Sequence, residues 1–99
     1  MSVYQIAQIT IKDRAEYDKY ADKFLGVFEK FDGKILSVDW EPKVVAGEWN
    51  ATRSILLEFP TKAAWKAWIT SPEYAEISVH RIAGADVNAI LVQSLGHQE

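Results

Sequence analysis

The first segment of the chain, residues 2–11, alternates its side chains with the period of a β-strand. Val3 and Ile9 lie on one face of this strand, and Tyr4 and Ile6 lie on the other. A strand with one face in water would be polar on that face, whereas both faces here carry apolar side chains. The pattern therefore predicts a strand that is covered on both faces.

An amphipathic helix is predicted next. Asp13 can cap its N-terminus, and Glu16 three residues later completes a capping-box pattern. Aromatic and aliphatic residues then recur at three- and four-residue steps, at Tyr17, Tyr20, Ala21, Phe24, Val27, Phe28 and Phe31. Charged residues fill other positions, as on the solvent face of an amphipathic helix. Gly33 is expected to end this helix in the left-handed conformation.

Two further extended segments are predicted in the middle of the chain. Residues 34–46 are interrupted by Pro42, which cannot donate to a β-ladder. That strand should therefore lie at an edge of the sheet or contain a bulge. Residues 47–50 supply a turn, and residues 51–59 form the most apolar strand, which is expected at the centre of the sheet.

The last third of the chain predicts a second helical region and a final strand. Thr61 can cap a short helix, and Ser71 can cap a restarted helix that has proline at its first position, which is the favoured order. The restarted helix is expected to run to about His80 and to be broken by Gly84. Residues 87–94 have the composition of a last strand.

The resulting order, β-α-β-β-α-β, is that of the ferredoxin-like fold of the α+β class. It predicts a single domain over residues 1–99, with a flexible tail at about 96–99. The antiparallel sheet should have four strands, with the first and third in the middle and the second at an edge. Right-handed crossovers place both helices on one face. The other face is left bare, so we expect a homodimer in which two copies pack these open sheet faces together.

Composition narrows the classes of function. The 99 residues are 48% apolar and 25% charged, with a net charge of −3, which is typical of a globular protein and argues against a nucleic-acid partner. The absence of cysteine excludes disulfides, thiol catalysis and thiolate metal sites. No apolar run approaches the ~18 residues that span a bilayer, and the N-terminus lacks the pattern of a signal peptide. We therefore expect a soluble, cytoplasmic protein with no membrane partner.

The second half of the chain resembles a known family. The residues that carry the resemblance are Gly47, Trp49, Arg53, Leu57-Glu58-Phe59-Pro60, Ala64, Trp68, Ser71-Pro72-Glu73-Tyr74 and Arg81. This pattern is similar to the domain-of-unknown-function 1330 family of the dimeric α+β-barrel superfamily, and the likeness extends over nearly the whole chain. That family often has a Gly-Gly pair after the second strand, where this chain has Asp39-Trp40, which adds bulk and a charge.

The resemblance implies a dimer whose sheets pack face to face, with a pocket between each sheet and its helices or partner. Relatives in the superfamily include cofactor-free monooxygenases, haem-degrading enzymes, muconolactone-isomerase-like proteins and stress-response proteins. The resemblance therefore indicates a fold and does not specify a reaction.

Arg53 is the first candidate for ligand binding. It stands near the start of a strand that is expected to be central, where an unpaired guanidinium is costly to bury. It can serve as an anchor for a carboxylate, enolate or phosphate. The alternative is an ion pair within the subunit or between subunits, with Asp39 or Glu41 as partners. Glu58 is disfavoured as a partner within the strand, because period two places it on the opposite face.

Several aromatic residues are candidates for pocket walls. Trp65 and Trp68 stand three positions apart on one helix, so both can face inward, as core residues or as pocket walls. Trp49, in a turn, and Tyr74, with its hydroxyl, are expected to line the pocket. Arg81, which belongs to the resembling pattern, completes the ligand-binding set.

His80 and Glu58 are the candidate catalytic residues, as groups that can move a proton. Each also has an ordinary structural explanation, since a histidine near a helix C-terminus gains from the helix dipole and a strand carboxylate can be a paired charge. The two histidines are too far apart in sequence for a common metal-binding motif, so no metal site is expected. A role for His80 as a haem ligand is the less favoured alternative, and no cofactor is expected.

Two hypotheses for function remain. The first is a homodimer that binds a small anionic or aromatic molecule beside an arginine and aromatic walls. The second is a cofactor-free monooxygenase or isomerase that acts on an aromatic or enolisable small acid.

Overall fold

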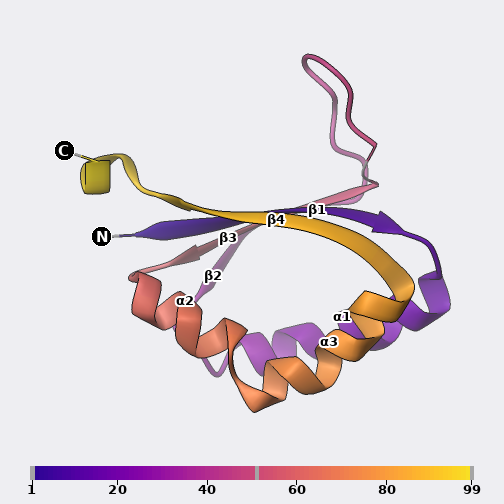
Figure 1. Ribbon diagram of the computed structural model, residues 1–99, viewed down its shortest axis with the longest axis horizontal. Coiled ribbons are helices and arrows are strands. Elements are labelled where there is room, and N and C mark those ends of the chain that lie inside the picture. The colour runs from indigo at the N-terminus through magenta and orange to yellow at the C-terminus, as the bar shows by residue number, and fades with distance from the viewer. Residues whose placement is uncertain (1, 51, 99) are drawn as a thin grey trace.

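In the part of the chain that the structure describes, four antiparallel strands form a single sheet, and three α-helices cover one of its faces (Figure 1). The computed structural model describes residues 2–50 and 52–98. The elements in chain order are β1 (Val3–Ile11), α1 (Arg14–Phe28), β2 (Lys34–Asp39), β3 (Arg53–Phe59), α2 (Lys62–Ile69), α3 (Pro72–Gly84), β4 (Ala85–Gln93) and a final 3-10 helix (Leu95–Gln98). No helix in the described ranges combines the length and the apolarity needed to cross a membrane.

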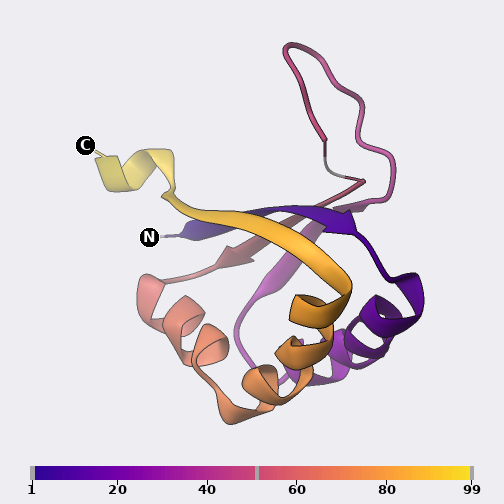
Figure 2. The same cartoon turned by 45° about the vertical axis from the view of Figure 1, so that its right-hand side comes forward.

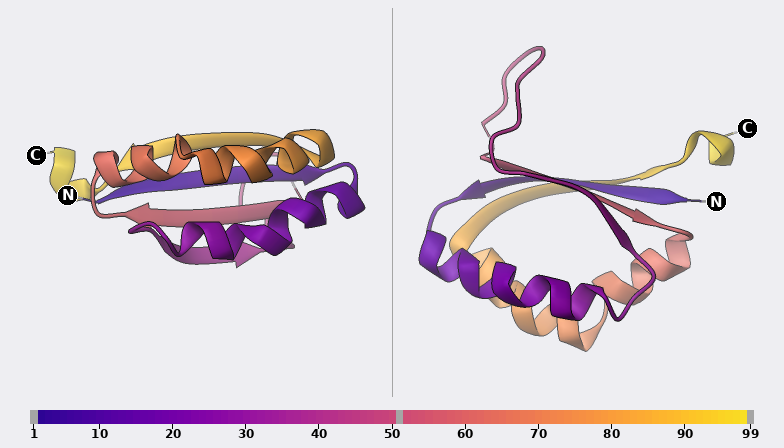
Figure 3. Two further views of the ribbon diagram at one scale, coloured as in Figure 1. Left: turned by 90° about the horizontal axis from the view of Figure 1, so that it is seen from below. Right: turned by 180° about the vertical axis from the view of Figure 1, so that it is seen from behind.

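The strand order is β2-β3-β1-β4, which confirms that the first and third strands are central and that the second lies at an edge. The ferredoxin-like α+β arrangement is also confirmed. The second helical region consists of two helices, α2 and α3, which are separated at Thr70 and Ser71. Seen from below in Figure 3, α1 lies nearer to β2 and β3, whereas α2 and α3 lie nearer to β1 and β4.

The pairing register places alternate residues on opposite faces of the sheet. Val3 and Leu57 face the helices and are almost fully buried. On the open face, Ile6 of β1 pairs with both Leu56 of β3 and Ile90 of β4. Ile90 is 60% exposed, so the open face carries the apolar surface that the sequence pattern predicts.

All three predicted helix caps are present. In each cap a side-chain oxygen accepts a hydrogen bond from a backbone N–H three residues later, which satisfies one of the unpaired donors of the first turn. The accepting and donating residues are Asp13 and Glu16 for α1, Thr61 and Ala64 for α2, and Ser71 and Tyr74 for α3. Local sequence therefore determines where each helix begins.

The predicted end of the first helix is wrong. Helix α1 ends at Phe28, and Gly33 does not adopt the left-handed conformation; among the described residues only Gly47 does, with a φ of 75°. A Cβ atom on Gly33 would lie 2.4 Å from Cζ of Phe28 and 2.7 Å from Cε1 of Phe59. Glycine is therefore required here because two aromatic rings approach the backbone closely.

Strand β2 is shorter than the predicted segment 34–46. It lies at the edge of the sheet and also has a register shift between Ile35 and Ser37. Pro42 lies beyond the strand, in a segment of residues 40–50 that extends away from the sheet on the side opposite the helices (Figures 1 and 2). The predicted first residue of β3, Ala51, lies outside the described residues.

Trp68 of α2 is the centre of the aromatic core and is only 1% exposed. Its ring stacks on Phe59 of β3 with a centroid separation of 5.5 Å, and it meets Phe28 of α1 edge-on at 5.5 Å. Tyr74 of α3 lies 4.4 Å away between centroids. Aromatic pairs of this kind stabilise a protein by more than the burial of their surface area alone. Through these contacts the single side chain of Trp68 joins the sheet to all three helices.

Candidate functional site

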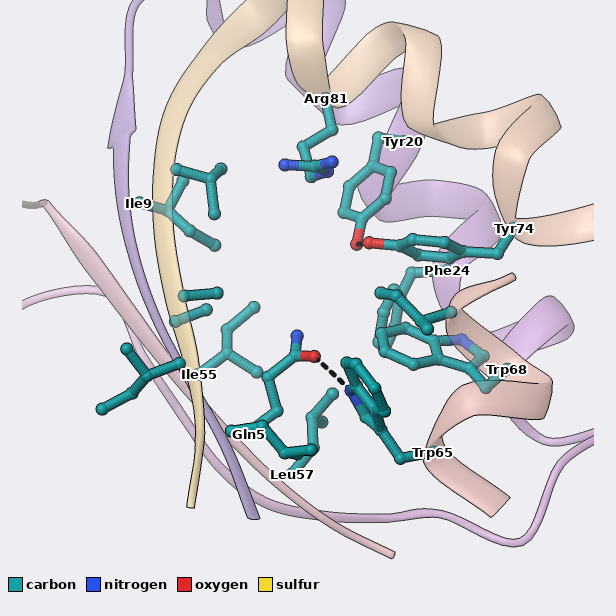
Figure 4. Close-up of a pocket in the computed structure, with 16 residues that line it drawn as sticks. Gln5, Ile9, Tyr20, Phe24, Ile55, Leu57, Trp65, Trp68, Tyr74 and Arg81 are labelled. Carbon is teal, nitrogen blue, oxygen red and sulfur yellow. Dashed lines mark hydrogen bonds between the residues drawn. The ribbon is translucent and has the colours of Figure 1, made fainter. Parts of the chain in front are cut away.

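A cavity of about 220 Å³ lies between the sheet and the helices (Figure 4). Its sheet side is built from β1, β3 and β4, and its helix side from α1, α2 and α3. The walls are mostly apolar, and they include Ile9, Ile55, Leu57, Phe24 and Trp68. A cavity with apolar walls and a few convergent polar groups is the usual form of a small-molecule site.

Among the described residues that line the cavity, Arg81 of α3 has the only side chain that is charged at neutral pH. Figure 4 shows its guanidinium group directed into the cavity. The Nε atom of Arg81 is buried and has no hydrogen-bond partner in the described part of the chain. No carboxylate of residues 2–50 or 52–98 lies within salt-bridge distance of this guanidinium. The charge is therefore uncompensated, and an anion in the cavity would relieve the cost of its burial.

Two tyrosine hydroxyls lie on the same side of the cavity as Arg81 (Figure 4). The hydroxyl oxygens of Tyr20 and Tyr74 are 3.0 Å apart and share one buried hydrogen bond. Burial raises the pKa of Tyr20 well above its usual value, and the neighbouring Tyr74 adds to the rise. Tyr20 is therefore a neutral phenol at neutral pH. Since one proton is used between the two hydroxyls, the other is free to be donated to a ligand.

A polar contact closes the opposite side of the cavity. The indole Nε1–H of Trp65 donates to Oε1 of Gln5 over 2.7 Å. Trp65 and Trp68 both line the cavity, which confirms that the two helix positions face inward. The cavity thus has a cationic, phenolic side and an amide side, with aromatic and aliphatic walls between them.

Arg53, by contrast, lies outside the lining of this cavity. It is 9% exposed, and one terminal nitrogen donates to the hydroxyl of Tyr17 over 2.7 Å. Its guanidinium carbon also lies 4.0 Å from the ring centroid of Trp40 and 5.4 Å from that of Tyr17. These cation–π contacts stabilise the charge. The guanidinium of Arg14 contacts the same Trp40 ring, 4.3 Å from its centroid.

The structure tests one of the alternatives for Arg53, the ion pair within the subunit. Within the described residues of one chain, Arg53 has no carboxylate within salt-bridge distance, so the ion pair inside the subunit is not found, whereas a pair between subunits stays a prediction. Arg53 lines a smaller neighbouring cavity of about 160 Å³ together with Tyr17. Burial raises the pKa of Tyr17, and the nearby Arg53 cation opposes that rise.

The structure places the remaining candidates apart from the cavity. His80 lies at the contact between α1 and α3, where its Nδ1 is 2.5 Å from a carboxylate oxygen of Glu16, and it does not line the cavity. Glu58 faces the open side of the sheet, where it pairs with Tyr4 in the strand register. Trp49 is 36% exposed and stands in the segment that extends from the sheet. Of the candidate residues, Trp68, Tyr74 and Arg81 are brought together.

Sequence reasoning missed three residues that shape this region. The sequence pattern places Tyr20 only in the apolar stripe of the first helix, and it distinguishes Trp40 only by its bulk. Gln5 could have been recognised from the sequence, because it is a polar residue among the apolar positions of β1 that face the helices, such as Val3 and Ala7. A polar residue on a buried face is more informative than an apolar one.

No group of three or more His, Asp or Glu side chains that could hold a metal ion occurs in residues 2–50 and 52–98. The polar groups of the cavity are an arginine, two phenols, an amide and indoles. This set suits recognition of an organic anion better than coordination of a cation.

The comparison with known families gives one match, to the family described as "Domain of unknown function (DUF1330)", over residues 2–95. No curated protein matches the chain.

Solved structures of the same fold exist. A protein of unknown function from Rhodopseudomonas palustris superposes with a TM-score of 0.80 at 20% identity, covering 95% of this chain and 82% of that one. SnoaB, a cofactor-independent oxygenase from Streptomyces nogalater, gives a TM-score of 0.71 at 11% identity, with coverages of 94% and 92%. A dimeric ferredoxin-like protein of unknown function from Jannaschia sp. CCS1 gives 0.71 at 10% identity, with coverages of 95% and 100%. At these identities the likeness establishes the fold.

The position of His80 leads to a prediction about pH. Hydrogen bonds from His80 and then Lys19 are the leading causes that hold the pKa of Glu16 below its usual value of 4.5. A carboxyl group with a lowered folded-state pKa stabilises the fold above its unfolded pKa, and this contribution is lost as the pH falls through the lowered value. We therefore expect Glu16→Gln to lower the melting temperature at pH 7, and we expect the difference from the wild type to shrink as the pH falls below 4.5.

Thermal melts followed by circular dichroism between pH 7 and pH 3 measure this difference. Glu76→Gln, at an exposed position of α3, is the control and should shift the melting temperature little at any pH. A Glu16→Gln effect that stays constant down to pH 3 would contradict the assignment of His80 and Glu16 as a structural pair.

Proposed function

The chain belongs to the family described as "Domain of unknown function (DUF1330)", and from that premise we propose that it binds a small organic anion in the cavity of each protomer of a homodimer. One observation carries the proposal. Arg81 is the only charged side chain of the cavity lining, and its Nε atom is buried without a partner among the described residues. A guanidinium offers several N–H donors in a plane that matches a carboxylate.

The surroundings of Arg81 define the kind of anion. The hydroxyl pair of Tyr20 and Tyr74 adds a neutral donor beside the guanidinium. Phe24 and Trp68 add aromatic rings to the rest of the cavity wall. A strongly hydrated inorganic ion would gain little from such walls, whereas an aromatic or aliphatic acid would bury its body against them.

A homodimer is supported by the open face of the sheet. Leu56, Ile6 and Ile90 lie side by side across β3, β1 and β4, on the face that no helix covers. The physical argument is that an apolar row at the centre of a sheet is stabilised when another apolar surface covers it. A second copy of the same face provides such a surface with twofold symmetry. The cytoplasmic location expected from the sequence stays a prediction.

The alternative is a cofactor-free oxygenase or isomerase, in which Arg81 and a tyrosine hydroxyl would stabilise an enolate oxygen of the substrate. The oxygenase with the same fold favours this reading. The two proton-moving candidates, His80 and Glu58, do not line the cavity, however. Binding without turnover is therefore the function that the site supports better.

Replacement of Arg81 tests the proposed anion anchor. We expect Arg81→Gln to weaken the binding of benzoate and phenylacetate at least about tenfold, because a hydrogen bond to a charged group contributes about 1.5–3 kcal/mol. Isothermal titration calorimetry measures the dissociation constants. Arg14→Gln, on the exposed side of α1, is the control and should bind as the wild type does. If Arg81→Gln keeps full affinity while Arg53→Gln loses it, the anchor is Arg53 and the assignment to Arg81 is wrong.

Replacement of Ile90 tests the dimer. We expect Ile90→Lys to convert the protein from a species of twice 11.2 kDa to one of 11.2 kDa, because a buried lysine at the centre of the interface would have no counter-ion. Sedimentation equilibrium at micromolar concentration measures the mass. Ile82→Lys is a matched control, since Ile82 is 68% exposed on α3 and Ile90 is 60% exposed on the sheet. A wild-type protein that sediments as a monomer would refute the dimer.

A further inference from the structure

The sheet contributes a single polar side chain to the cavity, Gln5 of β1. Every other lining residue from β1, β3 and β4 is apolar, including Ile9, Ile55 and Leu57. A polar group on this face must find a hydrogen-bond partner to offset the cost of its burial. Trp65 is such a partner, and the geometry of their contact has a consequence for the ligand.

The contact with Trp65 fixes the orientation of the Gln5 amide. An indole N–H can donate but cannot accept, so the atom of Gln5 that faces it, 2.7 Å away, must be the carbonyl oxygen Oε1. The amide nitrogen Nε2 then points the other way, with both of its N–H groups available. Figure 4 shows this nitrogen directed into the cavity, toward the side from which Arg81 enters. Gln5 is therefore a donor to whatever occupies the cavity.

Donors thus stand on two opposite sides of the cavity. Arg81 and the hydroxyls of Tyr20 and Tyr74 form the charged side, and the Gln5 amide forms the neutral side (Figure 4). Only one of the two sides carries a charge. A ligand that satisfies both sides needs one anionic group and one neutral hydrogen-bond acceptor, because a second anionic group would lack a counter-ion at Gln5.

The size of the cavity limits the body of the ligand. At about 220 Å³ it is smaller than the roughly 300–1,000 Å³ of pockets for drug-sized ligands. Phe24 and Trp68 on the helix side face Ile55 and Leu57 on the sheet side (Figure 4). A ligand with one ring is expected to bind between these walls more tightly than an extended chain, because a rigid ring loses less conformational entropy on binding.

We propose that the ligand is a compact aromatic acid with a carbonyl oxygen across the ring from its carboxylate. The carboxylate binds Arg81 and a tyrosine hydroxyl, and the carbonyl oxygen accepts from Nε2 of Gln5. Trp65 acts as a positioning residue, because it holds the amide in the orientation that presents a donor. This inference rests on the proposed binding function and specifies the class of molecule that is bound.

Matched probe molecules test the carbonyl requirement. The probes are 4-acetylbenzoate and 4-isopropylbenzoate, which have similar shapes but differ in that only the first carries a carbonyl acceptor; the 3-substituted pair covers the other geometry. We expect the wild type to bind the acetyl member of at least one pair about threefold to tenfold more tightly, as one neutral hydrogen bond implies. Calorimetry measures the ratio of the two dissociation constants, and benzoate serves as the reference anion.

Two variants assign that preference to Gln5. Gln5→Glu keeps an acceptor for the Trp65 indole but replaces the cavity-facing N–H groups with an oxygen, so the ratio should fall to about one or below. Trp65→Phe removes the contact that orients the amide, so the ratio should fall in part. A general loss of affinity from the new charge in Gln5→Glu affects both members of a pair, which is why the ratio is the readout. Thermal melts check that each variant is folded.

The outcomes separate this inference from the proposed function. If the wild type binds benzoate and both substituted probes equally, the anion site stands and the carbonyl requirement is wrong. If the acetyl preference survives in Gln5→Glu, the acceptor lies elsewhere and the role of Gln5 is overturned. If neither benzoate nor any probe binds, both the proposed function and this inference are overturned.

Discussion

The packing around Trp68 is the interaction on which the rest of this structure depends. Its indole ring contacts Phe59 of the sheet, Phe24 and Phe28 of the first helix, and Tyr74 of the last helix. Large rings meeting in offset and edge-on arrangements contribute more than their buried area alone. Because one side chain joins all the layers, it also sets where the helices stand over the sheet. The cavity lies on the flank of this cluster, with Trp68 as part of its wall.

The electrostatics of the helix–sheet layer follow from two arginines without carboxylate partners in the described ranges. Arg53 is stabilised within the protein by Tyr17 and Trp40. Arg81 faces an open volume instead, with Tyr20 held as a neutral phenol beside it. Arg53 is the more buried of the two, and in the described residues the Nε atoms of both lack a hydrogen-bond partner. They differ in their surroundings, since the rings of Trp40 and Tyr17 stabilise Arg53, and this difference makes Arg81 the group that a ligand would complete.

Local signals in the sequence were enough for much of the fold. The caps at Asp13, Thr61 and Ser71 lie where the pattern placed them, because a cap depends on residues only three positions apart. The edge position of β2 is confirmed, but the proline from which it was predicted lies beyond the strand, so the position follows from the β-α-β-β-α-β order instead. The predicted left-handed stop at Gly33 is wrong, because the glycine is needed where the rings of Phe28 and Phe59 approach its backbone. Phe28 is close in sequence, but the approach of Phe59 from β3 depends on the tertiary fold. The preference for Arg81 over Arg53 as the anion anchor likewise depends on the contact between Trp40 and Arg53, which no local sequence pattern reveals.

The sequence does contain a signal for Gln5, because this polar residue interrupts the apolar positions on the helix-facing side of β1.

The central claim is that the cavity between sheet and helices holds a carboxylate against Arg81. A crystal structure of the protein with 4-bromobenzoate tests this claim most directly, because the anomalous signal of bromine locates the ring and fixes its direction. The account predicts a bromine peak inside the cavity on the side of Gln5 and Trp65, with the carboxylate at the guanidinium of Arg81 and the tyrosine hydroxyls. A bromine peak beside Arg53 and Trp40, or an empty cavity with the ligand on the outer surface, would contradict it.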